Sequence, residues 1–343
     1  MLYYTTPPGD ILTDTDTAQP TEAKEQAQAI IKAFAAVGVG VALVKSTTAP
    51  QLNAYHFKLT KIKDFPKVKR NLPTVAAACR CEIMQTVSAV GDFCLTVPRQ
   101  RRQVISLCRV VNSPEFVRDK SALPVAVGVA SDNKIIVLDI AQMPHILLAG
   151  TTGSGKDPKR VEFGLYAGLP HLLHPIGTEP AAALHILKEL CRLMDNRYKE
   201  LEQEGKKNIA QTDKPHIILA VDELADLLLT DDGEAESYLI RLAQLGRAAG
   251  VHLILATQRP TRAVIPGLLS ANMPCKIALK VSSIRESVII LDHKGAEALT
   301  GCGDALIKTP DKTKEIRTQT AFTRAEDVES LVKWWTTQGI SEE

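Results

Sequence analysis

The chain has 343 residues, enough for two domains of ordinary size, and 45% of them are hydrophobic. Its 41 basic and 39 acidic residues leave a net charge of +2, so any surface for nucleic acid must be a local patch. Seven scattered cysteines without metal-ligand spacing or a secretion signal indicate reduced thiols rather than disulfides. No apolar run reaches the roughly 18 residues that a membrane span needs, which predicts a cytoplasmic protein.

The first part of the chain is predicted to be a leader followed by a small α/β domain. Residues 1–20 are rich in Thr, Pro and Asp, which indicates a mobile leader. A helix is expected over 21–37, ending at Gly38, and a strand over 54–59. Further short strands follow, so residues 21–140 form the first predicted domain.

Basic residues gather at two places in this first domain. For each cluster, a role as solvated surface is favoured over a contact with nucleic acid. The clusters are Lys61, Lys63, Lys67, Lys69 and Arg70, and then Arg99, Arg101 and Arg102.

From His145 onward, compact apolar runs alternate with helical patterns. This alternation predicts an α/β domain over 141–329, with a mainly parallel sheet covered on both faces, followed by a tail over 330–343. Helices are expected at 180–204 and 234–248 from their apolar periodicity. The expected strands are 146–148, 217–221, 253–256, 277–281 and 305–307.

A glycine-rich segment follows the first of these strands. It matches G-x-x-x-x-G-K, a loop whose glycines let backbone N–H groups turn inward around phosphates. The lysine adds a positive charge at the β and γ phosphates. A plain Gly- and Ser-rich turn is the alternative, and the apolar strand and the lysine argue against it. The loop residues are Gly150, Thr151, Thr152, Gly153, Ser154, Gly155 and Lys156.

Polar residues end two later strands. After strand 217–221, Asp222 would hold Mg²⁺ through its water shell, and Glu223 would orient and deprotonate an attacking water. After strand 253–256, Gln258 would sense the γ-phosphate. Alone, the carboxylate pair is also typical of a surface strand end, and a strand-end Gln often binds only the backbone. Downstream of a phosphate loop, the three residues predict a site for ATP and Mg²⁺.

Eight short segments, at 150–156, 157–160, 221–226, 247–250, 256–260, 281–283, 295–297 and 303–304, resemble signatures of the FtsK/SpoIIIE family of DNA translocases, in family order. The resemblance covers about residues 21–329. It implies a RecA-like P-loop ATPase domain that forms a ring, a hexamer in the family, preceded by a smaller α/β domain. It also implies ATP-driven movement of double-stranded DNA without sequence preference, as in chromosome partition. Candidates for DNA or subunit contacts are Arg259, Arg262, Lys276 and Arg285.

The chain departs from the family pattern at two points. The family loop continues with Ser or Thr, whose hydroxyl binds Mg²⁺, whereas Asp157 follows Lys156 here. Residues 157–173 resemble a family segment that normally lies one helix and one strand later, so about 25 to 35 residues are expected to be missing. Val288 stands where the family commonly has an arginine, with Arg285 as a nearby substitute.

Two functions of different classes stay open from the sequence. The first is an ATP-dependent double-stranded DNA translocase, with its chemistry carried by Lys156, Asp222, Glu223 and Gln258. The second is a degenerate relative that binds DNA or joins a ring but hydrolyses little ATP. Without the missing helix, whose N-terminus faces the phosphates, weak nucleotide binding and a gap in the sheet are expected. The chain ends soon after Trp335, so no sequence-reading winged-helix module is expected.

Overall fold

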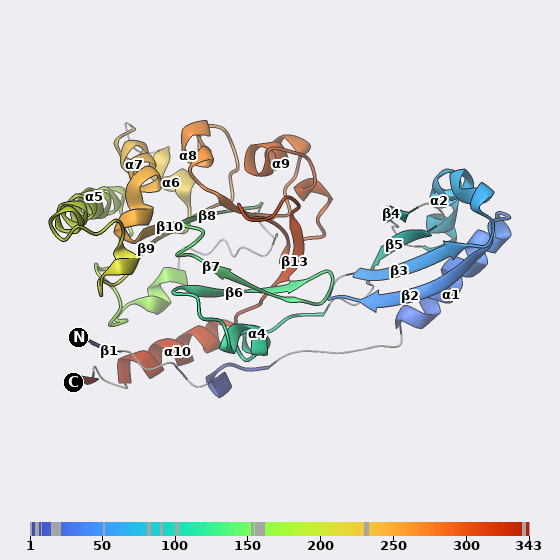
Figure 1. Cartoon of the computed structure of the whole chain (residues 1–343), viewed down its shortest axis with the longest axis horizontal. Coiled ribbons are helices and arrows are strands. Elements are labelled where there is room, and N and C mark those ends of the chain that lie inside the picture. The colour runs from blue at the N-terminus through green and yellow to red at the C-terminus, as the bar shows by residue number, and fades with distance from the viewer. Residues whose placement is uncertain are drawn as a thin grey trace.

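A computed structural model of the chain describes residues 2–3, 7, 9–14, 22–50, 52–80, 84–89, 92–99, 103–151, 154, 162–229, 233–337 and 341–342. Two units lie side by side in it (Figure 1). The smaller is built on a four-stranded sheet and the larger on an eight-stranded sheet. In the described part of the chain, no helix combines the length and the apolar character needed to cross a bilayer.

The smaller unit covers one antiparallel sheet with two helices. Its strand order is β2-β3-β5-β4. The predicted helix over 21–37 is confirmed as α1, and the αL conformation of Gly38 (φ +72°) follows it. Four aromatic side chains, Phe34, Tyr55, Phe57 and Phe93, are fully buried at its centre. The elements are α1 (Glu22–Ala36), β2 (Val41–Thr48), β3 (Leu52–Leu59), η2 (Ile62–Asp64), α2 (Phe65–Cys79), β4 (Met84–Ala89) and β5 (Asp92–Pro98).

The larger unit has the strand order β7-β6-β13-β12-β11-β8-β10-β9. The four strands from β11 to β9 are parallel, and the other neighbours pair antiparallel. All five predicted strands are present, although the fourth begins earlier than expected. The strands are β6 (Pro124–Ala130), β7 (Ile135–Asp139), β8 (His145–Ala149), β9 (Ile217–Val221), β10 (Val251–Thr257), β11 (Cys275–Leu279), β12 (Asp304–Lys308) and β13 (Ile316–Thr320).

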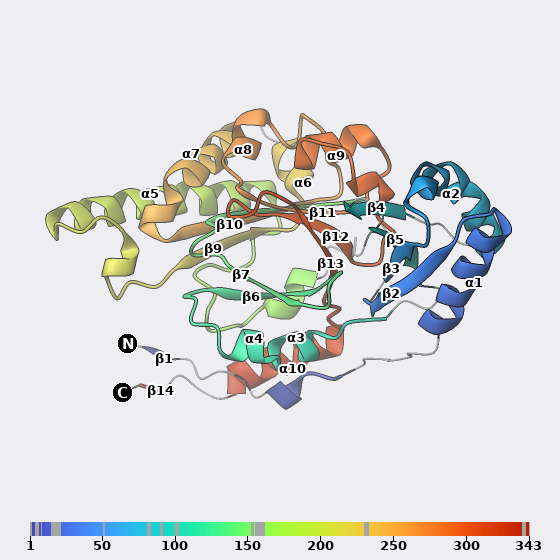
Figure 2. The same cartoon turned by 45° about the vertical axis from the view of Figure 1, so that its right-hand side comes forward.

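Helices cover the two faces of this sheet unequally. Figure 2 shows α5 to α9 on the upper side of the sheet, and α3, α4 and α10 on its lower side, below the strands β6 and β7. Both helices predicted in this part, over 180–204 and 234–248, are confirmed as α5 and α7. The helices are α3 (Leu107–Val111), α4 (Pro114–Val117), η3 (Glu162–Tyr166), α5 (Pro180–Gln203), η4 (Ile209–Gln211), α6 (Leu224–Leu228), α7 (Glu234–Ala249), α8 (Gly267–Ala271), α9 (Ile284–Leu291), η5 (Ala296–Ala298) and α10 (Ala325–Thr337).

The division of the chain differs from the one expected over 21–140. β6 and β7 belong to the larger unit, because β6 pairs with β13. Gly128 permits this pairing, since a Cβ there would lie only 2.0 Å from the carbonyl oxygen of Gln319. The boundary between the units therefore falls after β5 rather than after β7.

The described parts of the expected leader and tail make contacts of their own. Residues 9–14 pack on the larger unit, where the Thr13 amide donates to Asp327 of α10 over 3.1 Å and Ser106 donates to Asp14 over 3.0 Å. α10 occupies most of the expected tail. Near the two ends, β1 (Leu2–Tyr3) pairs with β14 (Ser341–Glu342). Thr21, the first residue of the helix expected over 21–37, lies outside the described residues.

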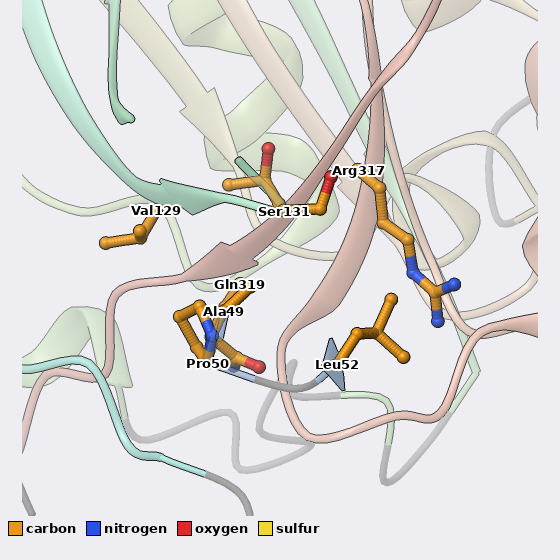
Figure 3. A pocket seen from close by; sticks show the side chains of 8 residues that line it. Ala49, Pro50, Leu52, Val129, Ser131, Arg317 and Gln319 are labelled. Atoms are coloured by element: carbon orange, nitrogen blue, oxygen red, sulfur yellow. The ribbon is translucent and has the colours of Figure 1, made fainter. Parts of the chain in front are cut away.

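The two units meet at the tip of the β2–β3 hairpin. Asn133 donates to the carbonyl of Thr48 over 2.6 Å, and the Gln103 amide donates to the carbonyl of Pro50 over 3.0 Å. A small pocket lies at this junction, seen from close by in Figure 3. Its lining residues are Ala49, Pro50, Leu52, Val129, Ser131, Arg317, Thr318 and Gln319.

Candidate nucleotide-binding site

The predicted phosphate loop begins where β8 ends, between the ends of β10 and β11. The Gly150 amide donates to the carbonyl of Thr257 over 3.2 Å, and the Thr151 amide donates to the carbonyl of Lys280 over 3.0 Å. Only glycine fits at 150, because a Cβ there would lie 2.6 Å from the Cβ of Leu279. The chain thus turns tightly at the carboxyl edge of the parallel strands, where such folds bind ligands.

Ser154 is the other described member of the loop. Its amide donates to the carbonyl of Thr151 over 3.0 Å, and its own carbonyl accepts from the Gly303 amide over 2.9 Å. The Ser154 hydroxyl is buried and has no hydrogen-bond partner among the described residues. A buried, unsatisfied hydroxyl is costly in a dry site, and an oxygen-rich ligand would satisfy it. The remaining loop residues, Thr152, Gly153, Gly155 and Lys156, lie outside the described residues.

Glu223 is held at the end of β10 rather than pointing freely into solvent. Its Oε1 accepts from the Thr257 hydroxyl over 2.5 Å and from the Ala225 amide over 3.2 Å, which caps α6. Its Oε2 accepts from the Gln258 amide over 2.8 Å. These three donors fix both oxygens of the carboxylate, so the carboxylate has one defined orientation beside the loop.

The other two residues predicted for the chemistry lie at the same edge. Asp222 directly follows β9, and Gln258 directly follows β10, and both side chains are half-buried. β8 and β10 are neighbours in the sheet, as are β10 and β9, so the strand ends carrying Gly150, Gln258 and Asp222 are adjacent. The structure therefore brings together the described members of all three predicted motifs.

Thr257 and an ion pair below the loop were not singled out from the sequence. Asp304 is fully buried, and Arg317 meets it with two hydrogen bonds, Nε to Oδ1 at 3.1 Å and Nη2 to Oδ2 at 2.7 Å. Thr300 donates to Asp304 from both its amide and its hydroxyl. This network holds the turn that contains Gly303, and that turn contacts Ser154. Gly303-Asp304 was noted only as a family segment, because its partner Arg317 is 13 positions further along the chain.

The four residues predicted for DNA or subunit contacts differ in accessibility. Arg259, Arg262 and Arg285 are exposed. Lys276 is only 6% exposed, and its ammonium contacts Ser270 over 3.0 Å and Asp292 over 3.1 Å. Its charge is satisfied within the fold, which argues against a DNA contact by Lys276.

On α9, Val288 lies one turn after Arg285, and both side chains are exposed. Residues three apart on a helix are neighbours on its surface. Arg285 is therefore placed to present a charge from the same helix face as Val288, the position where the family commonly has an arginine.

A chain of histidines lies at the opposite end of the same strands. His252 donates from Nδ1 to the carbonyl of Pro144 over 3.1 Å, and its Nε2 accepts from His216 Nδ1 over 2.8 Å. His145 accepts from the Leu253 amide over 3.1 Å. Burial lowers the pKa of His145 and the pKa of His252 to about 4 each, so both rings are neutral near pH 7.

The sheet is continuous from β7 to β9 in the described part of the chain, so the expected gap within it is absent. Instead, the side chains on its lower face, opposite α5 to α9, become more exposed from β11 toward β9. Cys275 and Ile277 of β11 are buried there, Ile254 of β10 is half-buried, and Ile218 of β9 is 45% exposed. An open apolar face at the end of the sheet is where the absence of a helix after the phosphate loop would show.

The chain is similar to the FtsK/SpoIIIE family, whose sequence profile matches residues 106–156, 157–216 and 210–262. It is 35% identical over 339 residues to the DNA translocase FtsK of Halalkalibacterium halodurans, covering 87% of this chain and 42% of that protein. It is 33% identical over 377 residues to the DNA translocase FtsK of Oceanobacillus iheyensis, covering 96% of this chain and 48% of that protein. The chain thus spans about half the length of the curated relatives it matches.

Two solved structures share the fold. One is the pCW3 conjugation coupling protein TcpA in its monomer form with ATPgS, with a TM-score of 0.59 and 22% identity, covering 90% of this chain and 99% of that one. The other is the cytoplasmic domain of the Thermomonospora curvata type VII secretion ATPase EccC, with a TM-score of 0.56 and 22% identity, covering 69% and 35%. The expected α/β fold is confirmed by these likenesses.

The family match breaks between Lys156 and Asp157, the point at which a segment is predicted to be missing. The Halalkalibacterium match runs over 339 aligned positions but covers only 87% of the 343 residues here. At about 40 aligned positions, therefore, only that relative has a residue and this chain has a gap. Both observations agree with a deletion inside the matched region.

Proposed function

This chain belongs to the FtsK/SpoIIIE family, and we propose that it is the motor region of an ATP-dependent double-stranded DNA translocase whose nucleotide site is incomplete after Lys156. The meeting of three strand ends supports this function best. The turn after β8 contacts the ends of β10 and β11, and the end of β10 holds Glu223, which follows β9. A phosphate loop and a fixed carboxylate at one sheet edge are the elements that phosphoryl transfer requires.

The residues at this edge fit a nucleotide in part. ATP with Mg²⁺ would supply the phosphoryl group whose transfer drives movement. The loop from Gly150 to Lys156 would bind the phosphates, Asp222 would hold Mg²⁺ through water, and Glu223 would orient and deprotonate the attacking water. Gln258 would sense the γ-phosphate. The poor fit is at Asp157, which stands in the sequence where the family has a metal-binding hydroxyl, because a carboxylate there would repel the phosphates.

The proposed substrate is double-stranded DNA, bound without sequence preference. Arg259 and Arg262 are exposed cations close in sequence to Gln258, and we assign them to contacts with phosphates rather than with bases. The proposed assembly is a homo-oligomeric ring, a hexamer as in the family, in which Arg285 of α9 faces a neighbouring subunit.

A second candidate is an ATPase-deficient relative that retains DNA binding or ring assembly. The break in the family match at Lys156 and the open lower face of β9 favour it. The lost helix would supply N–H donors and a positive dipole to the phosphates, and removing such groups costs orders of magnitude in rate. We therefore propose that this chain binds Mg-ATP weakly and hydrolyses it slowly or not at all.

The deciding experiment compares this chain with a version that carries a Ser-led helix and strand inserted between Lys156 and Asp157. Nucleotide binding, ATP hydrolysis with and without DNA, and displacement of a triplex-forming strand would be measured for both. The repaired chain is expected to show DNA-stimulated hydrolysis and strand displacement that Lys156→Ala and Glu223→Gln abolish. Brisk DNA-stimulated hydrolysis by the unrepaired chain, lost in Lys156→Ala, would show that the site is already complete. A repaired chain that binds ATP but neither hydrolyses it nor moves on DNA would contradict the translocase proposal.

A further inference from the structure

The smaller unit is strongly basic. Residues 22–99 hold eleven basic and five acidic side chains, a net charge of +6, whereas the whole chain has +2, so the rest of the chain carries −4. A charge separation on this scale points to an anionic partner at the smaller unit. The cations concentrate where β3 leads into α2. We call five of them the α2 basic patch: Lys61, Lys63, Lys67, Lys69 and Arg70.

All five side chains of the α2 basic patch are exposed. The turn η2 runs directly into α2, and Lys63, Lys67 and Arg70 follow one another at spacings of four and three residues. Side chains at these spacings are neighbours along one helix face, so the three cations form a stripe about 10 Å long. In Figures 1 and 2, no described element of the larger unit lies over α2. The stripe is therefore accessible to a large partner.

A single carboxylate lies within this cluster of cations. Lys67 pairs with the buried Asp64 over 2.8 Å, and the Lys67 ammonium, with Lys63 and Lys61 nearby, lowers the pKa of Asp64. The other four side chains of the α2 basic patch make no ion pair and no hydrogen bond with any described residue. Four of the five positive charges are therefore available to a partner.

The placement of these charges opposes the stability of α2 itself. Apart from Asp64 at the N-cap, the first turn of α2 contains no acidic residue, and cations gather at this end, where the helix dipole favours anions. Lys67 also has like charges three and four positions away, an arrangement that destabilises a helix. Local rules are broken in this way mainly at functional sites. A polyanion bound along the stripe would remove both penalties.

The surroundings of the patch favour duplex DNA over a single strand or a membrane. Binding to a single strand uses exposed aromatic rings, but four of the five aromatic side chains in residues 22–99 are fully buried and Phe65 is half-buried. Binding to a membrane surface needs an apolar face, and Ile62 is the one large apolar side chain exposed between residues 61 and 80. The closely spaced phosphates of a duplex match a stripe of cations on a helix.

We propose that the α2 basic patch binds the phosphate backbone of duplex DNA, as a contact of the smaller unit that is separate from the arginines after β10. The four available cations neutralise phosphates, and Lys67 is held in place by Asp64. The contact reads no base sequence and needs no nucleotide, so it operates despite the incomplete nucleotide site. It goes beyond the proposed function, which places DNA contacts in the larger unit, and it replaces the role as solvated surface expected from the sequence.

The test measures binding of the whole chain to a fluorescent duplex, without nucleotide, at several salt concentrations. The patch variant, Lys61→Gln/Lys63→Gln/Lys69→Gln/Arg70→Gln, leaves Lys67 to pair with Asp64. It should bind roughly tenfold more weakly or worse, and the slope of log affinity against log salt should fall by about three to four, because each phosphate contact contributes about 0.9. The matched control removes four exposed cations elsewhere and should change neither quantity by a comparable amount. The control variant is Lys24→Gln/Lys32→Gln/Lys312→Gln/Lys314→Gln.

A second measurement needs no substitution, so it holds even if the patch variant fails to fold. Lysines of the unsubstituted chain are acetylated with and without a saturating duplex, and the modified positions are read by mass spectrometry. The duplex should protect Lys61, Lys63 and Lys69 and leave Lys24 and Lys32 reactive. Circular dichroism checks that both glutamine variants keep the fold.

Equal affinity of the patch variant and the control variant would overturn the proposal, as would equal reactivity of the patch lysines with and without duplex. So would tighter patch-dependent binding to an oligothymidylate, or to vesicles of phosphatidylglycerol and phosphatidylcholine, than to duplex DNA. Failure of the proposed function is a separate outcome. If the repaired chain neither hydrolyses ATP nor displaces a strand, yet the patch variant loses duplex binding, the patch stands without the motor.

Discussion

The Thr257 hydroxyl donates a 2.5 Å hydrogen bond to Oε1 of Glu223, and this contact ties the end of β10 to the end of β9. The Thr257 hydroxyl also accepts from the Arg259 amide over 3.0 Å, and the Thr257 carbonyl accepts from the Gly150 amide. Through its hydroxyl and its carbonyl, this one fully buried residue thus links the proposed catalytic carboxylate, the phosphate loop and the segment with the exposed arginines.

Thr257→Val removes this hydroxyl while keeping the shape of the side chain. We expect the free energy of unfolding to fall by about 1 to 3 kcal/mol, because hydrogen bonds to a charged group contribute about that much. Thr257→Ser, which keeps the hydroxyl, should lower the free energy of unfolding by less than Thr257→Val does. Urea denaturation followed by circular dichroism measures the difference. The matched control is Thr309→Val, since the Thr309 hydroxyl is buried without a partner in the described part of the chain and its removal should be neutral or stabilising. Equal losses in the two valine variants would contradict the prediction.

Arg317→Met should destabilise the chain strongly, by about 3 to 5 kcal/mol, because it leaves Asp304 buried without its counter-charge. Arg317→Lys keeps the charge but loses the bidentate hydrogen bonding to Asp304, so an intermediate decrease in the free energy of unfolding is expected. Thermal and urea unfolding provide the measurement. Arg241→Met serves as the control, since the Arg241–Asp195 pair is well exposed and should change stability by less than about 1 kcal/mol. The prediction fails if the two methionine variants lose similar stability.

The buried histidines predict how stability depends on pH. Their folded pKa values of about 4 lie below the ordinary value of 6.5, so the unfolded chain binds more protons between these limits. Stability is therefore full above about pH 6.5 and declines as the pH falls toward 4, by on the order of 2 to 3 kcal/mol for each histidine.

His145→Asn should flatten this decline, because an amide oxygen can still accept from the Leu253 amide but does not titrate. Unfolding free energies measured from pH 4 to 8 test the difference. His185→Asn alters an exposed histidine and should leave the profile unchanged. An unchanged slope in His145→Asn would show that the decline has another source.

Arg262→Ala should weaken binding to DNA duplexes of unrelated sequence to a similar extent. An exposed arginine that neutralises a phosphate releases counterions, so the slope of log affinity against log salt should fall by about one. Fluorescence anisotropy at several salt concentrations measures both quantities. Arg262→Lys retains the charge and should keep most of the slope. A loss confined to one DNA sequence would instead indicate base recognition.

The sequence alone determined the elements of the parallel half of the fold, although not their order in the sheet. α1, α5, α7 and the strands from β8 to β12 follow from periodicity and from Gly and Pro positions, which act within a few residues. The strand-end residues Asp222, Glu223 and Gln258 were found for the same reason, because each directly follows a compact apolar run. The family resemblance and the break after Lys156 were also readable, since motifs are local patterns.

Only the tertiary structure decided which elements pair across long stretches of chain. The addition of β6 and β7 to the larger sheet depends on β13, almost 190 positions later, and no local pattern encodes that contact. The packing of residues 9–14 on α10, the Asp304–Arg317 pair and the role of Thr257 beside Glu223 have the same origin. The burial of Lys276 and the exposure of Ile218 run against their residue types. Whether a side chain is buried is set by what lies over it, and that cover comes from remote parts of the chain.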